Sequence, residues 1–123
     1  VLCSPARRAR ETLEPLRQHL PEGARVRIEK PLYMASAARL LARLRRLPDA
    51  QRDVLLIGHD PGLHALAVAL ARPGRSAALA RLREKLPTGA LVAFAVALPR
   101  WQALEPGSAH LVRFDRPRDL RGS

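Results

Sequence analysis

Apolar residues recur along the chain at two spacings, one typical of helices and one typical of strands. Helical spacing predicts a helix over residues 5–20, with Ser4 as its N-cap and Pro5 as its first helical residue. The same spacing predicts helices over residues 35–47, from about residue 61 to 70, and over residues 77–86. Pro48 and Pro73 stop the first two of these three helices.

Strand patterns lie between the predicted helices. Val26 and Ile28 alternate with arginines, which is typical of a short, half-buried strand. Residues 54–57 form an uninterrupted apolar run, which suits a strand buried on both faces of a parallel sheet, and residues 91–98 predict another buried strand. Residues 101–104 and 110–114 predict a hairpin around a Glu-Pro-Gly turn. Strands that alternate with helices indicate an α/β layered domain with antiparallel additions at its C-terminus.

Composition limits the classes of protein that fit this pattern. With 123 residues, 47% of them hydrophobic, residues 1–123 are expected to form a single domain with its own core. No apolar run approaches the roughly 20 residues of a membrane helix, so no membrane partner is expected. A lone Cys3 cannot form an internal disulfide, which predicts a reducing, cytoplasmic setting. The opening Val-Leu-Cys-Ser-Pro resembles the end of a strand entering a turn, so we expect native residues before Val1.

The chain is strongly basic, with a formal net charge of +11 that comes almost entirely from arginine. Such an excess is compatible with nucleic acid, with a phosphorylated substrate or with a codon-biased genome. Arg39, Arg43 and Arg46 recur on the polar side of a predicted helix, where solvent-exposed residues lie. The few aromatic residues are well spread, which gives little support to stacking on single-stranded nucleic acid.

Two strand-to-helix junctions carry the residues best suited to chemistry, because open α/β sheets bind ligands beyond the carboxyl ends of their strands. The first, Ser-Pro-Ala-Arg-Arg-Ala-Arg-Glu-Thr at residues 4–12, places arginines beside a helix N-terminus, which suits phosphate. Taken alone, it is a weak signal, and arginines that face solvent are the favoured interpretation.

The second junction is Gly-His-Asp-Pro-Gly at residues 58–62. Gly58 is expected to permit an abrupt chain reversal that projects His59 into the same crevice, where it suits acid, base or electrostatic work. A structural or capping histidine is the alternative. His64 is too poorly spaced to join His59 on one helical face, so no metal site is expected.

These motifs, Ser-Pro-x-x-Arg-Ala-x-x-Thr followed by a buried strand ending in Gly-His-x-Pro-Gly, resemble the histidine phosphatase superfamily, which has the phosphoglycerate-mutase-like fold. Lys-Leu-Pro-Thr-Gly-Ala at residues 85–90 narrows the resemblance to the SixA-like phosphohistidine phosphatases. Leu32-Tyr33, the segment around Trp101 and Arg-Pro-Arg-Asp-Leu at residues 116–120 support the same resemblance. It implies a three-layer α/β/α sandwich with a mostly parallel sheet and a C-terminal antiparallel hairpin.

The resemblance also implies a mechanism that needs no metal and no other cofactor. In that family, a histidine in an N-terminal Arg-His-Gly motif takes the phosphoryl group as a covalent phosphohistidine, which water hydrolyses. Arg8 would clamp the phosphoryl oxygens, His59 would contact them from the opposite side as an imidazolium, and Ser4 and Thr88 would help to bind and orient the substrate. Glu29, just after a predicted strand, is the candidate general acid, with an ordinary surface glutamate as the alternative.

The chain departs from the family in one respect, because it contains no Arg-His-Gly. We expect the nucleophile upstream of Val1, which makes residues 1–123 an N-terminally truncated histidine-phosphatase-like domain. The expected partner is a phosphorylated protein or a small phosphate ester, and the oligomeric state is left open. The alternatives are a non-catalytic relative that binds phosphate and a basic module that binds nucleic acid or acidic proteins.

Overall fold

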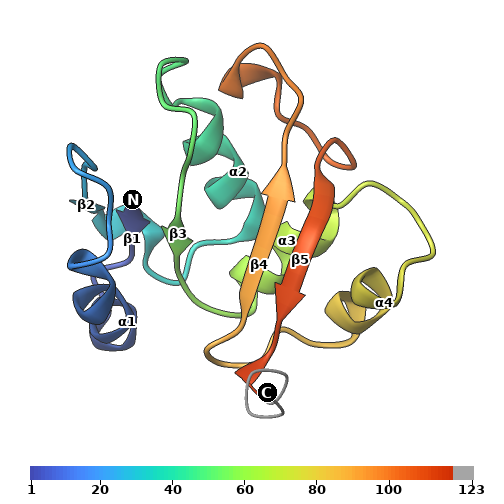
Figure 1. Cartoon of the computed structure of the whole chain (residues 1–123), viewed down its shortest axis with the longest axis horizontal. Coiled ribbons are helices and arrows are strands. Elements are labelled where there is room, and N and C mark those ends of the chain that lie inside the picture. Colours follow the sequence, from blue (N-terminus) through green and yellow to red (C-terminus); the bar gives the residue numbers. More distant parts are fainter. Residues whose placement is uncertain (118–123) are drawn as a thin grey trace.

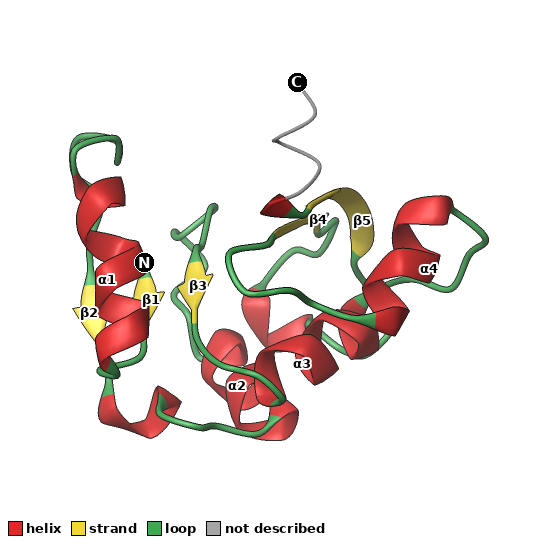
Figure 2. Cartoon of the chain, turned by 90° about the horizontal axis from the view of Figure 1, so that it is seen from below, coloured by secondary structure: helices red, strands yellow, loops and turns green. Residues whose placement is uncertain are grey.

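The computed structural model describes residues 1–117, whose helices and strands are shown in two views in Figures 1 and 2. In chain order the elements are β1 (Leu2–Cys3), α1 (Arg7–Arg17), β2 (Arg27–Ile28), the 3₁₀ helix η1 (Lys30–Leu32), α2 (Ala37–Arg45), β3 (Leu56–Ile57), α3 (Gly62–Leu70), α4 (Ala77–Glu84), β4 (Leu91–Ala95), the 3₁₀ helix η2 (Trp101–Ala103) and β5 (His110–Asp115). None of the helices in this part of the chain has the length and apolarity needed to cross a membrane.

The described strands form two separate sheets. In the first, β1 lies between β2 and β3 and pairs in parallel with both, so that Leu2 stands opposite Arg27 and Leu56. In the second, β4 and β5 pair antiparallel, with a register shift between Ala93 and Phe94. A parallel sheet combined with an antiparallel C-terminal hairpin confirms the predicted α/β fold class.

The parallel sheet is the middle of three layers. Cys3 of β1 packs with Ala9 and Leu13 of α1 in one buried cluster. Leu2, the neighbouring residue of β1, belongs to a different cluster that includes Leu40 of α2. Because successive residues of a strand point to opposite faces, α1 covers one face of the sheet, and α2 and α3 lie together on the other (Figure 2).

Helices α3 and α4 cover one face of the β4–β5 hairpin. Leu82 of α4 and Phe114 of β5 are both buried in the cluster that joins these elements. On the hairpin, Leu91 is 47% exposed and Val112 is 61% exposed. The prediction of a fully buried strand over residues 91–98 is therefore wrong, since β4 ends at Ala95 and has one uncovered face within the described chain.

The predicted hairpin partner of β5 is also wrong. Residues 101–104 form η2 and its cap instead of a strand, and β5 pairs with β4. The indole N–H of Trp101 donates a hydrogen bond to the carbonyl oxygen of Gln51, at 2.5 Å. A buried or half-buried indole N–H needs an acceptor, and this bond holds η2 against the loop that follows α2.

The parallel strands are shorter and more exposed at the margins of the sheet than predicted. Only Leu56 and Ile57 of the apolar run 54–57 are in β3, and Ile57 alone is buried. Ile28 of β2 is 45% exposed, although the alternating pattern predicts a half-buried strand there. Both strands lie at the margins of the described sheet, where fewer elements cover them.

Candidate functional site

The two predicted junctions meet at the carboxyl ends of β1 and β3. Ser4 directly follows β1 and is fully buried, and His59 follows β3 and is half-buried. Because β1 and β3 are paired in parallel, both residues leave the sheet at the same edge. The Nε2 atom of His59 lies 2.6 Å from the Oγ atom of Ser4. The structure therefore brings together two of the residues that the sequence singles out.

Ser4 does not have the capping role that was predicted for it. Helix α1 begins at Arg7 with Ala6 at its N-cap, two residues later than expected. The backbone at Ala6 is extended, with φ −59° and ψ 147°, so Ser4 lies too far from the first helical turn to cap it. Its Oγ atom instead accepts a hydrogen bond from the Ala6 N–H at 3.3 Å and faces His59.

The Ser4 contact determines which atom of His59 is available to a ligand. The hydroxyl hydrogen of a buried serine needs an acceptor, and Nε2 supplies one in the neutral ring that carries its proton on Nδ1. In the imidazolium, Nε2 donates to Ser4 and Nδ1 also carries a proton. Within the described residues Nδ1 has no partner and is not among the buried unsatisfied atoms, so it reaches solvent. In both states His59 can donate a hydrogen bond to an anion.

An aromatic residue that we did not predict as part of the site lies against His59. The rings of Tyr33 and His59 meet edge to face, with centroids 5.7 Å apart and an interplanar angle of 73°. Tyr33 and its neighbour Met34 are each 58% exposed, and Met34 has a positive φ of 50°, which is uncommon for a residue other than glycine. The only signal in the sequence is a Leu-Tyr pair in the loop after a predicted strand, which contributes to the resemblance and indicates no contact with His59.

Gly62, rather than Gly58, is the glycine that the second junction requires. A Cβ atom on Gly62 would lie 1.9 Å from the carbonyl oxygen of Ala35, so the start of α3 can approach this backbone only without a side chain. A Cβ atom on Gly58 would meet nothing closer than Leu63 Cδ1 at 3.9 Å. The prediction that Gly58 enables the turn is therefore wrong. The His59 carbonyl oxygen accepts from the Leu63 N–H at 2.8 Å, which ties the loop to α3.

Arg8 lies in the first turn of α1 with an exposed side chain. Its neighbour Arg7 is paired with Glu11 at 2.8 Å, and Arg10 shares a surface hollow with these two residues. Arg8 lies on a different side of the helix and forms no ion pair within residues 1–117. Its contact with a phosphoryl group stays a prediction.

Thr88 also stays a prediction. It is exposed in the turn before β4, where Gly89 has a φ of +81°, and in the described chain it makes no hydrogen bond to Ser4 or His59. Figure 1 shows this turn on the same lower side of the molecule as the loop that follows β3. Within the described residues no contact joins Thr88 to Ser4 or His59, so its role in substrate binding is still a prediction.

Glu29 is held by an arginine instead of being available as a general acid. Its two carboxylate oxygens accept from Nε and Nη2 of Arg43, at 2.6 Å and 2.9 Å. These hydrogen bonds, more than any other influence, lower the pKa of Glu29. A carboxylate that binds its proton more weakly than usual has none to donate near neutral pH, so the structure argues against the predicted role and for a structural ion pair.

The Glu29–Arg43 pair predicts a pH-dependent loss of stability on substitution. Both side chains are largely buried, with 22% and 15% exposed, so we expect Glu29→Gln to lower the free energy of unfolding by about 1–2 kcal/mol at pH 7. Because the folded-state pKa lies below the unfolded value near 4.5, the difference from wild type persists above that pH and disappears as the pH falls through the folded value.

Urea unfolding of the two proteins between pH 3 and pH 7 measures this difference. The matched control is Glu11→Gln, which breaks a pair whose side chains are 89% and 62% exposed and should change stability little. The assignment of Glu29 and Arg43 as a stabilising ion pair would be contradicted by either of two results. One is an equal loss of stability in the two variants at pH 7, and the other is a Glu29→Gln loss of stability that does not change with pH.

The other cysteine and histidine side chains of residues 1–117 are buried, bound elsewhere or outside the two junctions. Burial raises the pKa of the Cys3 thiol, so it stays protonated and unreactive behind Ser4. His64 is tied to α4, with Nε2 2.5 Å from the Leu82 carbonyl oxygen. His19 and His110 are exposed outside the two junctions. Between residues 1 and 117, no group of three or more His, Cys, Asp or Glu side chains is placed to hold a metal ion.

Comparison with known proteins gives relatives in sequence and in structure, although no family model matches the chain. The chain is 40% identical over 120 residues to the uncharacterized protein Rv1276c of Mycobacterium tuberculosis, covering 96% of itself and 73% of that protein. It is 39% identical over 119 residues to the uncharacterized protein ML1117 of Mycobacterium leprae, of which it covers 71%.

A solved structure extends the comparison. The "Putative Phosphohistidine Phosphatase SixA" from Nakamurella multipartitia superimposes with a TM-score of 0.79 and 27% sequence identity, over 94% of this chain and 69% of that chain. Of the resembling motifs, residues 118–120 of the closing Arg-Pro-Arg-Asp-Leu lie outside the described residues.

Proposed function

Because the chain belongs to the family of the mycobacterial proteins Rv1276c and ML1117 and has a SixA-like histidine phosphatase fold, we propose that it forms most of a phosphohistidine phosphatase. The observation that carries the proposal is the Ser4–His59 contact of 2.6 Å at the carboxyl edge of the parallel sheet. It leaves Nδ1 of His59 free to bind an anion at the edge where sheets of this class bind their ligands.

In the proposed reaction, an imidazole nitrogen of the enzyme attacks the phosphorus of the substrate phosphohistidine. The substrate P–N bond breaks, and the departing nitrogen keeps the electron pair and takes up a proton from solvent. Water then attacks the phosphorus of the enzyme phosphohistidine and gives up a proton to solvent. The enzyme P–N bond breaks, the imidazole nitrogen regains its electron pair, and inorganic phosphate leaves. His59 and Arg8 donate hydrogen bonds to the phosphoryl oxygens and stabilise the charge that they carry in each transition state.

The nucleophilic histidine of this proposal lies in a segment outside the 123 residues. The chain has no Arg-His-Gly, and its own remaining histidines lie away from the Ser4–His59 contact or are bound elsewhere. The relatives are longer than the part that this chain covers, which is 73% and 71% of their lengths. Within the described residues β3 and β4 belong to different sheets, and the proposal places a strand of such a segment between them.

The exposed aromatic ring of Tyr33, which lies against His59, supports phosphohistidine over a small phosphate ester as the substrate. Tyr33 presents an aromatic ring beside the imidazole of His59, and Met34, its neighbour in sequence, presents a thioether to solvent. Such groups favour contact with a flat, weakly polar ring such as the substrate imidazole. A phosphorylated protein is therefore the proposed substrate, and Tyr33 is proposed to contact its modified residue.

The test compares the full-length protein with residues 1–123 alone. We expect the full-length protein to hydrolyse a phosphohistidine-bearing protein and p-nitrophenyl phosphate without added metal, and we expect no turnover from residues 1–123. Phosphate release in the presence of EDTA measures both. Turnover by residues 1–123 would contradict the proposal that the nucleophilic histidine lies outside them. No hydrolysis by the full-length protein, together with nucleic-acid affinity that falls steeply with salt, would instead favour a basic binding module.

A further inference from the structure

The hydroxyl hydrogen of Ser4 has one acceptor in its surroundings, the Nε2 atom of His59. A serine hydroxyl has one hydrogen to donate and two lone pairs that accept. At Ser4, one lone pair accepts the Ala6 N–H at 3.3 Å, and Nε2 of His59 lies 2.6 Å from the same oxygen. Among the hydrogen bonds of residues 1–117, no other acceptor lies next to this hydroxyl. A donation from Ser4 to His59 is the arrangement that satisfies both groups.

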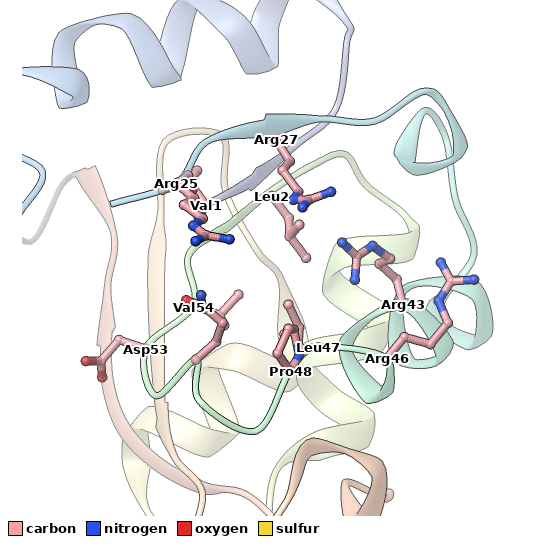
Figure 3. A pocket seen from close by; sticks show the side chains of 11 residues that line it. Val1, Leu2, Arg25, Arg27, Arg43, Arg46, Leu47, Pro48, Asp53 and Val54 are labelled. Atoms are coloured by element: carbon pink, nitrogen blue, oxygen red, sulfur yellow. Dashed lines mark hydrogen bonds between the residues drawn. The ribbon is translucent and has the colours of Figure 1, made fainter. Parts of the chain in front are cut away.

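The surroundings of the Ser4 side chain are closed on every side. Ser4 is 0% exposed, so neither water nor a substrate reaches its hydroxyl. The pocket in Figure 3 opens at the opposite, amino end of β1, where Val1 and Leu2 line it, and its lining does not include Ser4. A side chain without exposed surface also offers no room to an acceptor from outside residues 1–117. The hydrogen of Ser4 therefore goes to His59.

Backbone hydrogen bonds fix both partners of this contact. The Ser4 N–H donates to the Ile57 carbonyl oxygen at 3.0 Å, which holds the end of β1 against β3. The His59 carbonyl oxygen accepts from the Leu63 N–H at 2.8 Å, which holds the loop against α3. The ring of Tyr33 also meets the imidazole edge to face. The ring is thus held with Nε2 on Ser4, while Nδ1 reaches solvent.

The direction of the bond decides what a phosphoryl group meets at Nδ1 of His59. A neutral imidazole carries its proton on one ring nitrogen, and the other nitrogen only accepts. A proton on Nδ1 gives the phosphoryl oxygens a donor, whereas a proton on Nε2 leaves a lone pair on Nδ1 that repels them. Donation from Ser4 requires the first form. The imidazolium carries a proton on both nitrogens, so it donates at Nδ1 with or without the serine.

We propose that Ser4 is a positioning residue, which holds the neutral ring of His59 in the form that carries its proton on Nδ1. This role rests on the proposed function, in which His59 binds the phosphoryl group. It differs from direct substrate binding by Ser4, because the fully buried hydroxyl touches His59 and not the substrate. The loss of Ser4 therefore matters while the ring is neutral and has little effect on the imidazolium.

Other titratable groups near His59 do not replace the serine hydroxyl. Tyr33 contacts the ring by its edge, Asp60 follows it in the chain and is exposed, and Arg8 is exposed on α1. Burial raises the pKa of the Cys3 thiol, which therefore stays neutral. Within residues 1–117 none of these four side chains hydrogen-bonds to the imidazole. They are common to the wild type and to a serine variant, so their influence cancels when the two are compared.

Heteronuclear NMR spectra of the histidine ring nitrogens test the proton position directly. They are recorded on the full-length protein between pH 5 and pH 9, and His59→Ala identifies the signals of His59. We expect the neutral ring of the wild type to carry its proton on Nδ1. In Ser4→Ala we expect at least half of the neutral ring to carry it on Nε2, the form that free histidine prefers.

Ser76→Ala is the matched control, because it removes a serine hydroxyl that caps α4, 3.1 Å from the Leu79 nitrogen, and should leave the His59 signals unchanged. Three results would each overturn the proposal. They are a neutral wild-type ring with its proton on Nε2, a wild-type ring that is still doubly protonated at pH 9, and a Ser4→Ala spectrum identical to that of the wild type.

The kinetics of phosphohistidine hydrolysis give a second readout, on both sides of the pH at which the spectra show the His59 ring to lose its charge. With the neutral ring, Ser4→Ala should lower kcat at least about tenfold relative to the wild type. With the imidazolium, the loss should be less than about twofold. An equal loss at both pH values would show a purely structural role and overturn the proposal. Absence of hydrolysis by the wild type would instead contradict the proposed function, and the NMR spectra would still decide the proton position.

Discussion

His59→Ala is expected to lower kcat for phosphohistidine hydrolysis by the full-length protein roughly 100- to 1000-fold, the usual effect of removing one preorganised donor to a developing anion. The Nε2 atom of His59 is occupied by Ser4 at 2.6 Å, and Nδ1 is the atom that faces solvent. Alanine removes that donor and leaves the buried Ser4 hydroxyl without its acceptor. Phosphate release under saturating substrate measures the change.

His110→Ala is the matched control, because His110 is an exposed histidine on β5 and its loss should leave kcat unchanged. Circular dichroism of both variants should match the wild type. If His59→Ala kept more than about a tenth of the wild-type kcat, His59 would not be a phosphoryl-binding residue.

The same assay tests Arg8 against its helical neighbour. Arg8→Ala is expected to lower kcat in the same direction as His59→Ala, because both residues are proposed to bind phosphoryl oxygens. Arg10→Ala removes an equal charge from the side of α1 that carries Glu11 and Glu14 and should have little effect. If the two arginine variants lowered kcat equally, Arg8 would contribute only its positive charge and not a specific contact with the phosphoryl oxygens.

Features that depend on residues close in sequence could be predicted from the sequence. Helical spacing correctly gave helix α1, although the helix ends at Arg17 and not at residue 20, and the run before Gly58 gave a parallel strand that ends before His59. Parallel pairing then required Ser4 and His59 to emerge at one edge. Local pattern and topology were together sufficient to bring these two residues into one candidate site.

Features that depend on contacts between distant segments could not be predicted in this way. Tyr33 meets His59, which lies 26 residues further along the chain, and nothing near Tyr33 in sequence indicates that contact. Glu29 looked available because its partner, Arg43, lies 14 residues away on a helix face that we interpreted as solvated. The hairpin partner of β5 was missed for a similar reason, since an irregular segment with η2 separates the two strands.

Gly62→Ala is expected to destabilise the protein by about 2–4 kcal/mol, although alanine favours a helix over glycine by roughly 1 kcal/mol. The new Cβ atom would lie 1.9 Å from the Ala35 carbonyl oxygen, so the backbone of α3 or of the segment before α2 has to move. That steric cost exceeds the propensity gain, and urea unfolding measures the net result. Gly58→Ala is the matched control, since its Cβ atom would meet only Leu63 Cδ1 at 3.9 Å and should change stability by less than about 1 kcal/mol. A Gly62→Ala variant as stable as the wild type would show that α2 and α3 can separate without cost, and the position of His59 would then not depend on their close approach.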